Sequence, residues 1–112
     1  MKSKKFKTPL YGVRFEVIIY NNNEELEKRF KNVTLDPPIK DFDGVVLNID
    51  GKLYVVFSAD RKGYPTPGII VHEAKHLVNA IFIMIGHDLD PYNDEPECYL
   101  LSWVVNRIHE ML

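Results

Sequence analysis

The sequence predicts an α+β domain, because it contains both strand-like and helix-like segments within one chain of 112 residues. Segments rich in β-branched residues and a strong hairpin signal lie in the first half, and two long helical segments fill the second half. A chain of this length forms one ordinary domain and buries about two-thirds of the surface exposed by its unfolded form. We therefore expect residues 1–112 to form a single domain, with residues 1–10 as a flexible basic tail.

The first predicted elements are a strand and a short helix. Residues 13–20 begin with alternating polar and apolar side chains and are rich in β-branched and aromatic types, which favours a strand. Residues 24–31 carry two apolar residues four positions apart among charges, which predicts an amphipathic helix capped by Asn23. The proline, aspartate and glycine residues within 36–44 then predict a loop.

A hairpin is the next predicted element. The β-prone runs 45–49 and 52–57 are separated by Asp50 and Gly51, and an Asp-Gly pair favours the type I′ turn of a two-residue hairpin. We expect these two strands to be antiparallel neighbours.

A long helix is predicted over residues 67–85. Thr66 is suited to be its N-cap, Pro67 to be its first helical residue, and Gly86 to adopt the left-handed conformation that ends it. The segment is apolar almost all round, which is the pattern of a buried central helix.

The C-terminal helix is predicted to follow a polar loop over residues 87–94. It should begin near Asp94 or Glu95, because acidic side chains stabilise the first turn of a helix, and continue to about Met111.

The composition excludes several functional classes. A net charge of −2 provides no broad basic surface, so we do not expect nucleic acid as a partner. The longest apolar run, 80–85, is far shorter than the roughly 20 residues that span a bilayer, so no membrane span is expected. Cys98 is the only cysteine and allows no intrachain disulfide, which favours a cytoplasmic location.

The helix over 67–85 contains the motif His72-Glu73-Ala74-Lys75-His76. Residues four apart lie on one helical face, so His72 and His76 can direct a ring nitrogen each at one zinc ion. Glu73 projects beside them and is the candidate general base. Two histidines and a glutamate in a buried helix also need polar partners, and a zinc ion would supply them.

A catalytic zinc ion usually has three protein ligands, so one more must come from elsewhere. Asn79 and Phe82 stand where a metzincin motif would continue with glycine and histidine, which excludes that pattern. On the following helix we prefer Glu95 as the third ligand to Glu97, although both also suit a helix N-terminus. His87 in the connecting loop is a further candidate that ranks below both.

The two motifs together, His72–His76 and the run from Asp94 to Trp103, resemble those of the small gluzincin-type zinc proteins common in phage and prophage genomes. The resemblance covers about residues 49–107 and places the family's motif glutamate on Glu95. It implies a minimal zincin fold, in which a short, mostly antiparallel sheet packs on the motif helix and the glutamate helix crosses beneath the metal. It also implies that residues 53–57 form the strand nearest the cleft and that an extended peptide pairs with this edge.

Tyr99 lies one turn after Glu95 and could hold it or donate to a developing oxyanion, but its spacing with Trp103 favours a place in the core. The residues and the resemblance together predict a zinc metallopeptidase acting on a peptide or protein. The alternative is a non-catalytic zincin-fold module that binds another protein. A purely structural zinc site is disfavoured, because such sites are usually closed by four ligands rich in cysteine.

Overall fold

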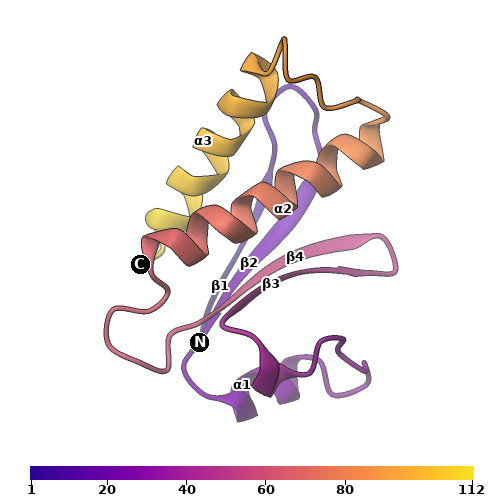
Figure 1. The fold of residues 1–112 in the computed structure, drawn as a ribbon. Coiled ribbons are helices and arrows are strands. Elements are labelled where there is room, and N and C mark those ends of the chain that lie inside the picture. Colours follow the sequence, from indigo (N-terminus) through magenta and orange to yellow (C-terminus); the bar gives the residue numbers. More distant parts are fainter.

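The computed structural model describes residues 1–112 and shows an α+β fold built on one four-stranded sheet (Figure 1). The strands are β1 Lys2–Lys7, β2 Arg14–Tyr20, β3 Gly44–Ile49 and β4 Lys52–Ser58. The α-helices are α1 Asn23–Arg29, α2 Pro67–Ile85 and α3 Glu95–His109, and a short 3-10 helix, η1, spans Ile39–Asp41.

The sheet is mixed, with the strand order β1-β2-β4-β3. β1 and β3 are the edge strands and pair antiparallel with β2 and β4, respectively. The two central strands, β2 and β4, pair in parallel, with Phe15 opposite Leu53 and Tyr20 opposite Ser58. The expectation of a mostly antiparallel sheet thus holds for the two outer pairings but not for the central one.

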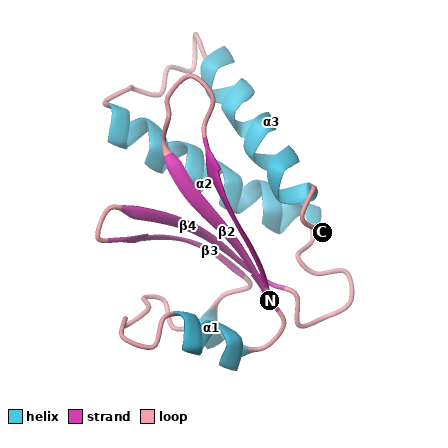
Figure 2. Cartoon of the chain, turned by 180° about the vertical axis from the view of Figure 1, so that it is seen from behind, coloured by secondary structure: helices cyan, strands magenta, loops and turns pink.

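Three layers result from the alternation of side chains along the two central strands. One face of β2 and β4 packs against α2 and α3 through a core that includes Phe15, Val55 and Leu77. The opposite face, with Ile18 and Val56, packs against α1 and the segment that follows it. Figure 2 shows these helices on opposite sides of the sheet and the β3–β4 hairpin turning away from β1 and β2.

The N-terminal segment is ordered as strand β1, so the prediction of a flexible tail over residues 1–10 is wrong. Its lysines are exposed, while Phe6 stacks on Phe15 at a centroid distance of 5.5 Å and meets the edge of Trp103. Lysine is common on sheet edges because its charge discourages pairing with a further strand. The packing of Phe6 and the backbone pairing with β2 therefore order a segment whose lysines predict a solvated tail.

The predicted hairpin and the predicted bounds of α2 are confirmed, whereas α1 spans Asn23–Arg29 instead of residues 24–31 and α3 ends at His109 instead of near Met111. Asp50 and Gly51 both have positive φ angles, of 53° and 81°, as a type I′ turn requires. Thr66 caps α2 by accepting a hydrogen bond from the Ile69 amide, and Gly86 ends the helix in the left-handed conformation. The cap of α1 is Asn22 rather than the predicted Asn23, which is the first helical residue.

Helix α2 is long and apolar enough to cross a membrane, judged by length and composition alone. In this structure Ile70, Leu77 and Ile81 are among the apolar residues of α2 that pack in the core, whereas Ile83 and Met84 near its C-terminus are exposed. The fold therefore accounts for part of its apolar composition.

Candidate metal centre

His72 and His76 lie one turn apart on the surface of α2 and bring their rings together. Their Nε2 atoms are 3.1 Å apart and their ring centroids 4.7 Å apart. Two nitrogens that each lie about 2.0–2.1 Å from a tetrahedral zinc ion are separated by roughly 3.3 Å. The observed spacing of the two imidazoles therefore fits two ligands of one zinc ion.

The two histidines are exposed, which differs from the buried environment inferred from the sequence. The His72 side chain is 68% exposed, and Ile83, farther along the helix, is 79% exposed. The helix buries one side against the sheet and α3 and leaves the other side exposed, and apolar residues occur on both. Because both rings are exposed, water can bind their nitrogens, and a metal ion is not required as a hydrogen-bond substitute.

Glu73 is the buried polar group of the motif. Its side chain is only 10% exposed, and its Oε2 lies 3.8 Å from Nε2 of His72. The carboxylate makes no hydrogen bond to another protein group and meets no lysine or arginine. The imidazole of His72 is the one basic group within ion-pair distance, and the carboxylate oxygens are not sealed from solvent. The motif thus brings one carboxylate next to two exposed imidazoles.

Gly44 gives Glu73 the space it occupies. A Cβ atom at Gly44 would stand 2.9 Å from Cγ of Glu73 and 3.0 Å from Cγ2 of Ile69. Contacts this short force atoms to shift, so only glycine lets the start of β3 lie this close to α2. The sequence predicts Gly44 to be part of a loop. No local pattern in the sequence predicts its contact with the motif helix.

A cleft opens between α2 and the residues that lead into β3, and we call it the α2–β3 cleft. Its volume is about 590 Å³. It is lined by Asp41, Phe42, Asp43, Gly44, Thr66, Gly68, Ile69, His72 and Glu73. β3 is therefore the strand nearest the motif, and the expectation that residues 53–57 take that place is wrong. That strand, β4, is central, because β3 pairs with its outer side.

The first turn of α3 contacts the motif helix through Glu97. Its carboxylate forms an ion pair with Nζ of Lys75, which also donates a hydrogen bond of 2.9 Å to Oδ1 of Asn79. Glu95 is exposed and forms no hydrogen bond or ion pair with α2. Of the two glutamates, the structure thus brings Glu97 to the motif helix. No group of three or more histidine, cysteine, aspartate or glutamate side chains converges in the manner of a complete metal site.

The remaining candidates lie away from the two histidines. His87 follows the end of α2, where its ring packs at 4.6 Å from the ring of Phe82. Tyr99 is 72% exposed on α3, so the preferred reading of this residue as part of the core is wrong. Cys98 is also exposed.

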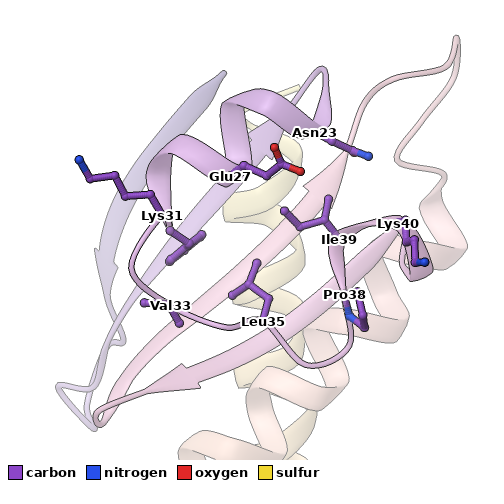
Figure 3. A pocket seen from close by; sticks show the side chains of 9 residues that line it. Asn23, Glu27, Lys31, Val33, Leu35, Pro38, Ile39 and Lys40 are labelled. Atoms are coloured by element: carbon purple, nitrogen blue, oxygen red, sulfur yellow. The ribbon is translucent and has the colours of Figure 1, made fainter.

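A second cavity, of about 390 Å³, lies on the other face of the sheet between α1 and the segment that leads to η1 (Figure 3). Apolar side chains such as Leu35 and Ile39 line it, with Lys31 and Lys40 nearby. It contains no histidine or cysteine and is separated from the motif by the sheet.

Comparisons of the chain with protein-family models, curated proteins and solved structures gave no match. The functional interpretation therefore rests on the residues of the site.

Proposed function

We propose that this protein is a zinc-dependent metallopeptidase of the gluzincin type, in which His72 and His76 bind the zinc ion and Glu73 is the general base. One observation carries the proposal: the Nε2 atoms of His72 and His76 lie 3.1 Å apart on the exposed face of α2, and Oε2 of Glu73 lies 3.8 Å from Nε2 of His72. The resemblance of the motifs to small phage and prophage zinc proteins agrees with it. The substrate would be a peptide or protein in the cytoplasm.

The third ligand would come from the first turn of α3. The resemblance favours Glu95, whereas contact with the motif helix favours Glu97. If Glu97 binds the metal, its carboxylate must leave Lys75. Glu95 would instead need to turn from solvent toward the histidines, while Lys75 continued to hold Glu97.

Zinc bound at these residues would supply a Lewis acid, which lowers the pKa of water towards about 7 and polarises the carbonyl group of a substrate. The chain contributes the proton transfer. Oε2 of Glu73 faces the histidines and would accept the proton of the attacking water, then pass it to the leaving amine. The close approach of Gly44 holds the carboxylate on this side of α2.

The exposed edge of β3 supports a peptide substrate. β3 pairs with β4 on one side only, so the backbone groups of its other side are free to bind an extended chain. Addition of a strand to a sheet edge gives affinity through main-chain hydrogen bonds. Because β3 begins at Gly44, a peptide on this edge would run past Glu73.

A non-catalytic module with the same fold is the second candidate. The absence of a converged third ligand favours it, since binding to another protein needs no metal. The position of Glu73 beside His72 favours the enzyme, because a binding module has no need of a general base next to two histidines.

The test compares the wild type with Glu73→Gln on a mixed peptide library, with the zinc content of both proteins measured. We expect about one equivalent of zinc in each and a loss of cleavage in the variant of about 100-fold or more, which is the usual contribution of a general base. Glu24→Gln is the matched control, because Glu24 is exposed in the first turn of α1. Equal cleavage by wild type and Glu73→Gln contradicts the mechanism. Zinc binding without cleavage by the wild type favours the binding module.

A further inference from the structure

β1 forms an open edge of the sheet. It pairs with β2 on one side only, so the main-chain groups on its outer side have no strand partner. Every residue of β1 except Phe6 is exposed. β1 and β3 lie at opposite edges of the sheet, so this edge is separate from the candidate metal centre beside β3. An open edge of this kind can accept one more strand.

The open edge carries a high positive charge. Four of the six residues in β1 are lysines, namely Lys2, Lys4, Lys5 and Lys7. None of them forms an ion pair. Lys2 donates a hydrogen bond of 3.1 Å to the main-chain carbonyl oxygen of Met111, which carries no net charge. The protein's own carboxylates therefore do not neutralise this strand.

The neighbouring strand does not supply the missing negative charge. Lys7 lies opposite Arg14, and like charges at directly opposed positions destabilise a sheet. Lys5 lies opposite Glu16, but both carboxylate oxygens of Glu16 already accept hydrogen bonds from Arg29. Lysines that only protect an edge from pairing need no further cation on the inner strand. The Lys7–Arg14 pair therefore favours an anionic ligand over edge protection alone.

The directions of the lysines distinguish an added strand from a broad anionic surface. Lys2 and Lys4 lie opposite residues of β2 that face α2 and α3. Successive side chains alternate, so Lys5 and Lys7 lie on the face that α1 covers in part. A membrane surface or a nucleic acid reaches only one of these pairs, whereas a strand beside β1 has side chains on both faces.

The charge of the remaining molecule also disfavours a large polyanion. The chain has 14 basic and 16 acidic side chains, and four of the basic ones are in β1, which leaves ten basic against 16 acidic elsewhere. A polyanion that extends beyond the edge would be repelled by this excess of negative charge. A short acidic segment confined to the edge would not.

A second copy of the chain does not offer a complementary strand. The other edge strand, β3, contains no acidic residue, and β1 itself would bring lysine against lysine. Glu16 is the only acidic residue in any strand, and its strand, β2, lies inside the sheet. The occupant that fits is therefore a segment of a different protein.

We propose that the outer edge of β1 binds an extended acidic segment of a partner protein, which adds a fifth strand and places carboxylates beside the four lysines. Main-chain hydrogen bonds supply affinity, and the lysines select for acidic side chains. The lysines occupy the first, third, fourth and sixth positions of β1, a pattern that is the same from either end. A peptide with acids at those four positions thus fits in either direction.

The test measures binding of acetyl-Glu-Val-Glu-Glu-Val-Glu-amide to the zinc-free full-length protein by NMR titration. Two control peptides each change one property. The glutamine analogue removes the charges, and the N-methylated analogue keeps the carboxylates but loses its main-chain N–H donors. We expect the acidic peptide to bind at least about tenfold more tightly than either control and to weaken as salt is added. The largest shifts should fall on the backbone amides of β1.

Matched double variants test the lysines. Lys4→Gln/Lys5→Gln removes two charges from β1, and Lys31→Gln/Lys40→Gln removes two exposed lysines elsewhere. The first variant should bind the acidic peptide at least about threefold more weakly than wild type, and the second should bind it equally well.

Several results would overturn the proposal. Full affinity in Lys4→Gln/Lys5→Gln, or equal binding of the acidic and glutamine peptides, would reject selection by the lysines. Equal binding of the N-methylated peptide would reject an added strand. Tighter binding of hexathymidylate than of the acidic peptide, or binding to phosphatidylserine vesicles that Lys4→Gln/Lys5→Gln abolishes, would assign the edge to a nucleic acid or a membrane instead.

Discussion

At the scale of single residues, the absence of a side chain at Gly44 allows the start of β3 to lie close to Glu73 of α2. Alanine at position 44 would place its Cβ within 3.0 Å of both Glu73 and Ile69. We expect Gly44→Ala to destabilise the protein by about 1–3 kcal/mol, the usual cost of overpacking a tight contact. It should also lower peptide cleavage, because Glu73 is displaced. Urea unfolding and the peptide assay measure the two effects.

Gly68→Ala is the control for that substitution. A Cβ at Gly68 meets no atom closer than the Thr66 hydroxyl oxygen, at 4.0 Å. Since alanine is favoured over glycine in a helix, this variant should be neutral or more stable by up to about 1 kcal/mol. If Gly44→Ala unfolds at the same urea concentration as wild type, the close approach of the two elements does not constrain Glu73.

Single substitutions also distinguish Glu95 from Glu97 as the third zinc ligand. If Glu95 binds zinc, Glu95→Gln should weaken zinc affinity by at least about tenfold, since loss even of outer-shell partners costs 10–100-fold. In that case Glu97→Gln should have a small effect. Lys75→Met gives an independent measurement, because it releases Glu97 from its ion pair. A rise in affinity in Lys75→Met together with a loss in Glu97→Gln would assign the ligand to Glu97.

The histidine pair was predictable and the rest of the site was not. The spacing of His72 and His76 follows from the period of the helix, which a sequence shows directly. The exposure of the histidines and the close contact of Gly44 with Glu73 depend on which elements pack against α2. Those contacts join residues far apart in the chain, and no local pattern specifies them.

At the scale of secondary-structure elements, one ion pair fastens α1 to the sheet. Glu16 of β2 is buried and accepts hydrogen bonds of 2.6 and 2.9 Å from the two terminal nitrogens of Arg29. Because loss of the Glu16 charge leaves the guanidinium partly buried without its partner, Glu16→Gln should destabilise the protein by about 1–3 kcal/mol. Arg29 is about one-third exposed, which limits the effect. Urea unfolding provides the measurement.

Glu110→Gln is the control for this pair. Glu110 pairs with Arg107 three residues away, and its side chain is 55% exposed. Exposed pairs contribute roughly 0–1 kcal/mol, so this variant should unfold close to wild type. Equal effects of the two substitutions would show that burial does not strengthen the Glu16–Arg29 pair.

Elements with local signals were predicted from the sequence, and elements defined by distant partners were not. The β3–β4 hairpin and the ends of α2 depend on turn and capping residues that stand next to them, and the start of α3 was predicted from the acidic residues of its first turn. β1 contains four lysines among six residues and becomes a strand only because β2 offers it a partner. The parallel pairing of β2 with β4 likewise has no local signature.

At the scale of the whole molecule, stability should fall in strongly alkaline solution. Tyr20 is buried at the end of β2, and burial raises the pKa of its phenol above the usual value near 10. The folded state therefore retains this proton at a pH where the unfolded chain releases it. The contribution is fully present below about pH 10 and is lost as the pH rises through the folded-state pKa.

Comparison of Tyr20→Phe with wild type isolates this effect, because phenylalanine keeps the ring and removes the proton. Above pH 10 we expect wild type to lose stability in urea more steeply than Tyr20→Phe. Tyr92→Phe should behave like wild type, since Tyr92 is almost fully exposed. The same slope in all three proteins would mean that Tyr20 titrates as an exposed tyrosine does.

The strand order also affects the order in which the elements fold. The β3–β4 hairpin joins strands that are adjacent in sequence and can form early. The parallel pairing of β2 with β4 requires closing the long segment between them, which contains α1, η1 and β3. Closing such a long segment is slow compared with forming a hairpin. The contact between Gly44 and Glu73 joins this early hairpin to α2, so we expect the candidate centre to be completed only when the helix settles on the sheet.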